Sequence, residues 1–175
     1  MSLRPPVSAD DHSSGKNDAP IELVEYGDYE CPHCGRAYPI LQKLQHKMGD
    51  DLRFIFRNFP LAEMHPHAIM AATAAEAAAL QGKFWEMHDI IFEHQQELSG
   101  HALIDFAEQL KLDVNKFAND IRSQALADKV EEDFESGMRS GVNGTPTFFI
   151  NGVKYEGSWE DEDLYEYLQA VLKDI

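Results

Sequence analysis

The feature that most constrains the fold is a pair of cysteines, Cys31 and Cys34, placed where a strand pattern gives way to a helix pattern. Residues 21–26 alternate apolar and polar side chains, which is typical of a strand. Apolar side chains then recur at helical spacing over residues 32–49, which predicts a helix that begins at the cysteines. Residues 52–57 predict a second strand, and two strands joined in this way are expected to lie parallel with a right-handed crossover.

A long helical stretch separates this unit from the last strands. Residues 64–138 carry helical patterns and no strand pattern. Strand character returns at 144–150, and Asn151-Gly152 predicts a tight hairpin turn into a strand at 153–155. The chain is therefore predicted to be an α/β fold with an inserted all-helical subdomain.

The predicted division of the chain has three parts. Residues 1–19 are polar and rich in Pro, Asp and Ser, which indicates a flexible N-terminal arm with little structure of its own. Residues 20–61 and 139–175 form the α/β domain, and residues 62–138 form the inserted helical subdomain. The cysteine pair lies in the first half of the α/β domain, before the insert.

The excess of acidic residues limits the kinds of molecule that the protein is expected to bind. Asp and Glu total 31 residues against 15 Lys and Arg, a formal net charge of −16. A chain this acidic is not expected to bind nucleic acid or anionic membrane surfaces, because phosphate binding needs a basic patch. No run approaches the roughly 18 apolar residues of a membrane-spanning helix, so no membrane insertion is predicted.

The visible N-terminus bears on localisation. It has no apolar segment of the kind that marks a signal peptide. We therefore expect a cytoplasmic protein, or a periplasmic one if a signal peptide was removed. Stable disulfides are rare in the cytosol, so the direction of any redox reaction depends on the compartment.

The cysteine pair predicts redox chemistry rather than a structural disulfide, because a disulfide that closes so short a loop constrains the unfolded chain very little. Cys31 is expected near the N-cap, where free backbone N–H groups and the helix dipole favour an anion. Pro32 suits the first helical position, and His33 can add a positive charge or a hydrogen bond beside the sulfur. These effects lower the pKa of Cys31 and make it the attacking thiol, with Cys34 as the more buried resolving thiol.

A zinc site is the alternative interpretation of the pair. Zinc usually needs four ligands, and His65 and His67 are the nearest candidates to complete the set. Their spacing lies outside the familiar zinc-finger patterns. We therefore predict no metal, and no cofactor other than a redox-active disulfide between Cys31 and Cys34.

Two further positions each allow two interpretations on the residues alone. Glu25 stands in an otherwise apolar strand, either as a buried carboxyl that accepts or relays a proton from Cys34 or as a residue that faces solvent. Thr145-Pro146 precedes the third strand, where a proline has no N–H to donate to a sheet. The bond is either cis, which places the Thr145 backbone beside Cys31 for an extended substrate, or part of an ordinary turn.

Several motifs together resemble the DsbA-like family of thioredoxin-fold proteins. Residues 24–34 look like that family's active-site segment, and residues 142–152 resemble its cis-proline strand. Residues 57–61 and 65–68 look like the entry to its inserted helical domain, and residues 82–88 resemble the second helix of that domain. The chain is also similar to domains fused to sodium/proton antiporters in some bacteria.

The resemblance implies a thioredoxin fold and assigns roles to the site residues. It implies that Cys31 is the nucleophile, Cys34 the resolving thiol and Pro146 the cis-proline, and it makes Glu25 match the family's buried acid. The implied function is disulfide exchange with protein or peptide thiols, with a redox partner that recycles the pair. Thr145 and Pro146 would then bind the substrate.

Two other classes of function stay open on the sequence. The pair could switch a partner contact in a redox-sensing module with little turnover, as the similarity to antiporter-fused domains suggests. A transferase or isomerase that acts on glutathione conjugates or small aromatic compounds could share the fold. Such enzymes need a serine or a lone cysteine at the first position, and the intact Cys31-Pro32-His33-Cys34 motif counts against them.

Overall fold

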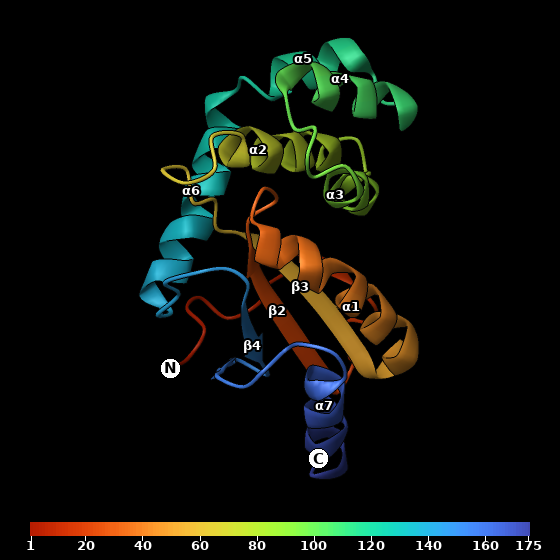
Figure 1. Cartoon of the computed structure of the whole chain (residues 1–175), viewed down its shortest axis with the longest axis vertical. Helices are drawn as coiled ribbons and strands as arrows, with labels where there is room; N and C mark the ends of the chain where they lie inside the picture. Colours follow the sequence, from red (N-terminus) through yellow and green to blue (C-terminus); the bar gives the residue numbers. More distant parts are fainter.

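The computed structural model describes residues 1–175, which form one five-stranded sheet with helices packed against it and a helical insert beyond one end of the strands (Figure 1). The strand order is β1-β3-β2-β4-β5. The strands are β1 (His12–Ser14), β2 (Ile21–Gly27), β3 (Leu52–Asn58), β4 (Thr147–Ile150) and β5 (Val153–Tyr155). β2 is therefore the central strand, with a neighbour on each side.

The cysteines lie where this central strand leads into the first helix. β2 and β3 run parallel and are joined by α1 (Pro32–Met48), as the sequence predicts. β2 also pairs antiparallel with β4, with Leu23 opposite Ile150. Because β2 has partners on both sides and packed layers on both faces, every residue from Leu23 to Gly27 is buried, Glu25 included.

A tight hairpin joins the last two strands. Asn151 (φ 48°) and Gly152 (φ 80°) both adopt left-handed backbone conformations. This is the geometry of the two-residue turn that an Asn-Gly pair predicts. The neighbouring Phe148 and Phe149 point to opposite faces of the sheet and belong to different cores.

The apolar side chains separate into three cores. The first lies between one face of the sheet and the helices α1 and α7 (Asp163–Lys173), and the second covers the opposite face. The third is the interior of the insert, and it extends to Cys31 and Cys34. The cysteines therefore lie at the junction between the insert and the sheet. None of the helices combines the length and the apolar character needed to cross a bilayer.

Five helices between β3 and β4 make up the insert. They are α2 (Ala68–Ala79), α3 (Phe84–Glu93), α4 (Gly100–Gln109), α5 (Val114–Asp120) and α6 (Gln124–Arg139). Alanines dominate α2, and each residue from Ala71 to Ala78 is buried, so that neighbouring helices can approach it closely. Ser99, Asp113 and Ser123 cap α4, α5 and α6 by accepting hydrogen bonds from backbone N–H groups. In Figure 1 the insert lies beyond the end of the sheet where α1 begins, and α6 runs back along the sheet.

The N-terminal segment differs from its prediction as an arm with little structure. Its β1 pairs antiparallel with β3 on one side of the sheet. Ser2 forms a β-bridge with Val153 of β5 on the other side. Between these contacts, Leu3 is buried in the second core and Val7 packs against it. The segment thus crosses one face of the sheet as an ordered layer.

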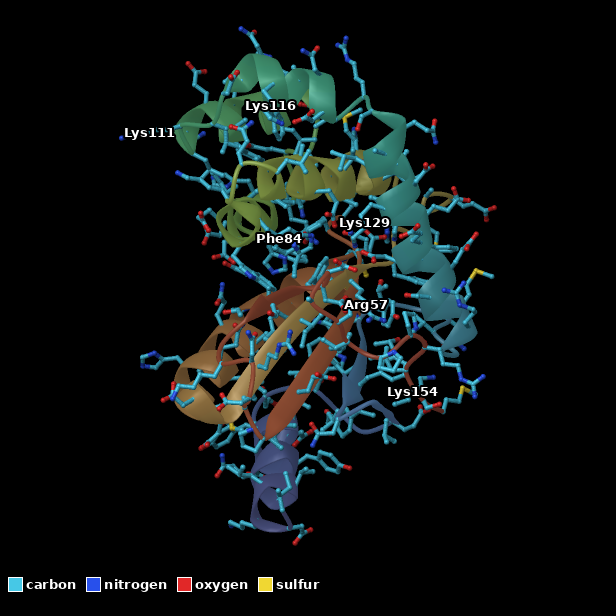
Figure 2. The ribbon with its side chains drawn as sticks, turned by 180° about the vertical axis from the view of Figure 1, so that it is seen from behind. Arg57, Phe84, Lys111, Lys116, Lys129 and Lys154 are labelled. Atoms are coloured by element: carbon cyan, nitrogen blue, oxygen red, sulfur yellow. The ribbon has the colours of Figure 1, made fainter.

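A buried arginine is the physical reason for this order. Arg57 of β3 donates two hydrogen bonds to the Asp11 carboxylate, at 2.8 and 2.9 Å. It also donates to the carbonyls of Pro5 and Pro6, at 3.0 and 3.3 Å. Figure 2 shows Arg57 on this side of the molecule, between the sheet and α6. A buried guanidinium needs hydrogen-bond acceptors. The polar, proline-rich segment, whose composition predicts disorder, supplies these acceptors and is ordered by them.

Candidate active site

β2 leads directly into the turn that carries the two cysteines. Cys31 is the N-cap residue of α1, with an extended backbone (φ −68°, ψ 124°), and Pro32 occupies the first helical turn. The Cys31 N–H donates to the Asp28 carbonyl at 3.1 Å, and the Gly35 N–H donates to the Cys31 carbonyl at 3.0 Å. The structure therefore places Cys31 at the start of α1, as the sequence predicts.

Both cysteines are free thiols, and the surroundings of Cys31 favour its thiolate. The pKa of Cys31 is lowered to about 5. The main cause is the hydrogen bond from the Cys34 thiol, and the Thr145 hydroxyl and the backbone N–H groups of His33 and Cys34 outweigh the opposing effect of burial. A thiol with this pKa is mostly thiolate at neutral pH, so it can both attack and leave readily.

Cys34 lies in the opposite kind of environment. Its side chain is fully buried, and burial raises the pKa of this thiol well above its ordinary value. The Asp28 N–H donates to the Cys34 sulfur at 3.5 Å. The pair is therefore asymmetric, with one sulfur held as an anion and the other as a neutral thiol.

Glu25 is buried in the central strand, so the interpretation as a solvent-facing residue is wrong. Only 1% of its surface is exposed, and Oε1 has no hydrogen-bond partner. Burial, with the added negative charge of Cys31, raises the pKa of Glu25 to about 8. The carboxyl is thus protonated at neutral pH and close to the range where it can give up its proton.

A small cavity of about 60 Å³ adjoins Glu25. It lies at the seam between α1 and α3, and Gln42, Gln45 and Asp89 are among its polar lining residues. Gln42 donates to the Asp89 carboxylate at 3.0 Å, and burial raises the pKa of Asp89 to about 6. A cavity of this volume with polar groups in its wall is large enough for water.

The Thr145-Pro146 peptide bond is cis, so the interpretation as an ordinary turn is wrong. The Thr145 carbonyl lies 3.7 Å from the Cys31 sulfur. The Thr145 hydroxyl is buried and has no hydrogen-bond partner, which leaves it able to donate to a Cys31 thiolate. A cavity of about 200 Å³ lies beside Pro146, with Trp159 in its wall, and the Arg36 guanidinium of α1 lies 5.6 Å from the centre of the Trp159 ring. Thr145 therefore lies next to the Cys31 sulfur, and Pro146 follows it in the chain.

Pro32 and His33 lie on the exposed side of the first helical turn. The backbone N–H of His33 is one of the groups that lower the pKa of Cys31. Its imidazole, for which the sequence predicts a charge or a hydrogen bond beside the sulfur, faces solvent. In this structure His33 therefore acts on Cys31 through its main chain.

Gln95, in the segment after α3, is a site residue that sequence reasoning missed. Its side-chain amide donates to the carbonyls of Tyr29 and Cys31, at 2.9 and 2.7 Å. A Cβ atom at Gly35 would collide with the same amide, which explains the glycine that follows the second cysteine. A glutamine between two helices belongs to no motif, so no signal in the sequence could have found it.

The two histidines that the sequence offers as zinc ligands bind carboxylates. His65 Nδ1 lies 2.8 Å from Asp28 Oδ2, and His67 Nδ1 lies 3.2 Å from Glu30 Oε1. No group of three or more His, Cys, Asp or Glu side chains is arranged to hold a metal ion. Both histidines line a groove of about 570 Å³ that also borders Pro32.

Comparison with known proteins gives a family match over most of the chain. A family model described as thioredoxin matches residues 8–170. The Na⁺/H⁺ antiporter NhaA 1 of Mycolicibacterium vanbaalenii is 42% identical over 96% of this chain, and that of Salinispora arenicola is 44% identical over 94%. The chain spans only 28% and 25% of the length of these two antiporters, so the similarity concerns one part of each.

Solved structures share the fold over nearly the whole chain. A thioredoxin-like oxidoreductase from Silicibacter pomeroyi has a TM-score of 0.83 and 23% identity, and covers 95% of this chain and 94% of its own. BdbD from Bacillus subtilis, in its oxidised form, has a TM-score of 0.81 and 27% identity over 92% of each chain. α-DsbA1 from Wolbachia pipientis has a TM-score of 0.80 and 22% identity over 97% of this chain and 96% of its own. From the family match and this shared fold, the chain belongs to the thioredoxin family and has its DsbA-like form, with a helical insert.

Proposed function

We propose that the protein is a thiol–disulfide oxidoreductase that exchanges disulfides with protein or peptide thiols through Cys31 and Cys34. The observation that carries the proposal is the asymmetry of the pair. The pKa of Cys31 is lowered to about 5 at the start of a helix, whereas burial raises the pKa of Cys34. The fold is that of thiol–disulfide oxidoreductases, which supports this chemistry.

In the oxidising direction, a substrate thiolate attacks the Cys31 sulfur of the Cys31–Cys34 disulfide. Cys34 leaves and takes up a proton, and a mixed disulfide joins the substrate to Cys31. A second substrate thiolate then attacks its partner sulfur, and Cys31 leaves as a thiolate. Two electrons pass from two substrate thiols to the pair, and the low pKa of Cys31 favours the last step. In the reducing direction the same steps run backwards, and a redox partner restores the pair after each cycle.

Glu25 supplies the proton that Cys34 needs when it leaves. Its carboxyl is buried and protonated at neutral pH because burial raises its pKa to about 8. When Cys34 instead attacks a mixed disulfide, Glu25 first loses its proton to solvent through the cavity and then accepts the thiol proton of Cys34. The cavity lined by Gln42 and Asp89 connects this exchange with solvent.

The substrate binds as an extended peptide beside Thr145 and Pro146. Backbone groups next to a cis-proline are free to pair with an added strand, because proline donates nothing to a neighbour. The cavity of about 200 Å³ beside Pro146 receives a substrate side chain against Trp159. Such a groove binds mainly the backbone of the substrate, so it can accept protein thiols in many different sequences.

Serine substitutions test this mechanism. Cys31→Ser is expected to abolish exchange, because no thiolate attacks or leaves. Cys34→Ser is expected to accumulate mixed disulfides, because Cys31 still attacks and nothing resolves the product. The measurements are turnover with a protein disulfide substrate, and non-reducing electrophoresis with mass analysis of the trapped species. Unchanged turnover in the Cys31→Ser protein would rule the mechanism out.

The reduction potential of the Cys31–Cys34 pair, measured in glutathione buffers, shows whether the protein oxidises or reduces its substrates. A value near about −120 mV corresponds to a protein that donates disulfides, and one near about −270 mV to a reductant.

A second candidate function, a redox-sensing module, is favoured by the similarity to parts of two antiporters. It predicts binding of a partner that depends on the redox state, with negligible turnover in the assay above.

A further inference from the structure

Two histidine–carboxylate pairs fasten the loop before the insert to the turn before Cys31. His65 Nδ1 lies 2.8 Å from the Asp28 carboxylate, and His67 Nδ1 lies 3.2 Å from the Glu30 carboxylate. The His67 backbone N–H also donates to Glu30 Oε2 at 2.6 Å. The paired residues are two apart on both segments, so loop and turn meet in register. The mechanism proposed above uses none of these four side chains.

Of these four residues, Asp28 is held most firmly by burial and hydrogen bonds. Its side chain is completely buried, whereas that of His65 is 14% exposed at the wall of the groove. The Asp28 carboxylate also accepts hydrogen bonds from the backbone N–H groups of Glu30 and Leu61, each at 2.8 Å. A buried carboxylate with three donors is held at one place and in one orientation.

The backbone of Asp28 makes a hydrogen bond to each of the two cysteines. Its N–H donates to the Cys34 sulfur at 3.5 Å, and its carbonyl accepts the Cys31 N–H at 3.1 Å. His65 is therefore linked through Asp28 to the Cys34 sulfur and to the backbone N–H of Cys31. A change at His65 can reach the redox pair without any contact with substrate.

The charges around His65 favour its imidazolium form. Burial works against the charged ring, but the hydrogen bond to Asp28 and the negative charges of Asp28, Cys31 and Glu30 outweigh it and raise the pKa of His65. Gln95 and Glu97 of the insert line the same groove, so the insert adds one further carboxylate and no cation there. If the Cys31 thiolate stabilises a charged His65, then a charged His65 stabilises the thiolate by the same amount.

We propose that His65 is a positioning residue that sets the redox poise of the Cys31–Cys34 pair: its positive charge, held by Asp28, stabilises the Cys31 thiolate and so favours the reduced protein. The inference deepens the proposed function and rests on it for its biological use. Reduction places a negative charge near His65, so the ring holds its proton to higher pH in the reduced protein than in the oxidised one. As the pH rises through that range, His65 loses its charge and the reduced form loses this stabilisation.

Two substitutions separate charge from shape. His65→Gln keeps a donor for Asp28 without a charge, and His65→Lys keeps a charge that does not titrate near neutral pH. We expect the acid ionisation constant of Cys31, followed by the ultraviolet absorbance of its thiolate, to fall about two- to fivefold in His65→Gln, the size of a partly exposed charge pair. In His65→Lys it stays close to the wild-type value. The equilibrium constant with glutathione shifts by the same factor towards the protein disulfide in His65→Gln.

His67→Gln is the matched control. It removes the neighbouring ring, which is 47% exposed and contacts Glu30 rather than Asp28, so the ionisation constant of Cys31 should not change. A third measurement uses the wild-type protein alone. The His65 ring, followed by nuclear magnetic resonance, should titrate at higher pH in the reduced protein than in the oxidised one.

Three results would overturn the inference. They are an unchanged ionisation constant in His65→Gln, an equal loss in His65→Gln and His65→Lys, and the same His65 titration in both redox states. The last readout needs no variant, so it decides the matter even if a substitution prevents folding. All three measurements work without a substrate. A protein that passes them but does not exchange disulfides would contradict the proposed function and leave the role of His65 intact.

Discussion

Glu25 and Cys34 are both buried beside Cys31, and burial favours the neutral form of each. This arrangement has a cost for Glu25 that depends on pH. The unfolded carboxyl loses its proton near the ordinary value of 4.5, whereas the folded one holds it to about 8. The unfolded state therefore binds fewer protons in this range, and the free energy of unfolding falls as pH rises from about 4.5 to about 8.

Replacing Glu25 by glutamine should remove that fall. We expect Glu25→Gln to unfold with a free energy about 2–4 kcal/mol higher than wild type at pH 8, with little difference at pH 4.5. Urea unfolding of the oxidised proteins at both pH values measures this, because Cys31 then carries no charge and burial, the larger cause of the raised pKa, acts alone. Glu22→Gln, on the same strand but partly exposed, is the control and should change the pH dependence much less. Identical pH dependence in Glu25→Gln and wild type would contradict the buried-acid interpretation.

At the scale of elements, the turn before α1 is held from outside by the insert. Gln95 donates to the Tyr29 and Cys31 carbonyls, and Gly35 leaves room for its amide. The insert therefore takes part in the candidate active site even though most of its helices lie beyond the end of the sheet (Figure 1). Gln95 lies inside the insert and the two carbonyls lie before it in the chain, so the contact forms only when the insert packs against the turn.

Gln95 and Gly35 should act as a unit. Gln95→Ala leaves two carbonyls without their donor and should lower the free energy of unfolding by about 1–2 kcal/mol. Gly35→Ala should cause a similar loss, because its Cβ displaces the same amide. The double variant should then lose little more than either single one, as a double-mutant cycle by urea unfolding would measure. Gly144→Ala, where a Cβ meets nothing within 4 Å, is the control. Strictly additive losses would contradict the shared contact.

At the scale of the whole molecule, three cores meet around one sheet, and the N-terminal segment closes the second of them. Its attachment depends on the Arg57 guanidinium, whose side chain is only 4% exposed and is paired with Asp11. Without the Asp11 carboxylate, the buried Arg57 guanidinium would keep only uncharged hydrogen-bond acceptors. Burial of an unpaired charge is among the largest single costs in a folded protein.

Asp11→Ala should therefore destabilise the protein strongly. We expect the free energy of unfolding to fall by about 3 kcal/mol, because Arg57 stays buried without its partner. Thermal and urea unfolding measure the loss. Asp50→Ala, which removes the partner of exposed Lys16, is the matched control and should leave stability nearly unchanged. A loss in Asp11→Ala no larger than in the control would mean that the segment does not stabilise the fold.

Local patterns predicted the parts of the fold that depend on neighbours in sequence. The strand over residues 21–26, the helix that begins at the cysteines and the Asn151-Gly152 turn are of this kind. Gln95 and the His65–Asp28 pair were missed because they join segments far apart in the chain. For Glu25 and Thr145-Pro146, the residues alone allowed two interpretations, and burial or backbone geometry separates them.

The path of the N-terminal segment has one more consequence. Residues 12–14 form the outer strand on one side of the sheet, and residues 2–3 lie against β5 on the other, where the Leu3 N–H donates to the Gly152 carbonyl at 2.8 Å. One stretch of chain thus covers β3 with a short outer strand and also pairs with β5, which leaves fewer unpaired backbone groups that could recruit strands from other molecules. The proposed exchange would bring partly unfolded polypeptides close to the protein, and covered sheet edges offer them fewer backbone groups to pair with.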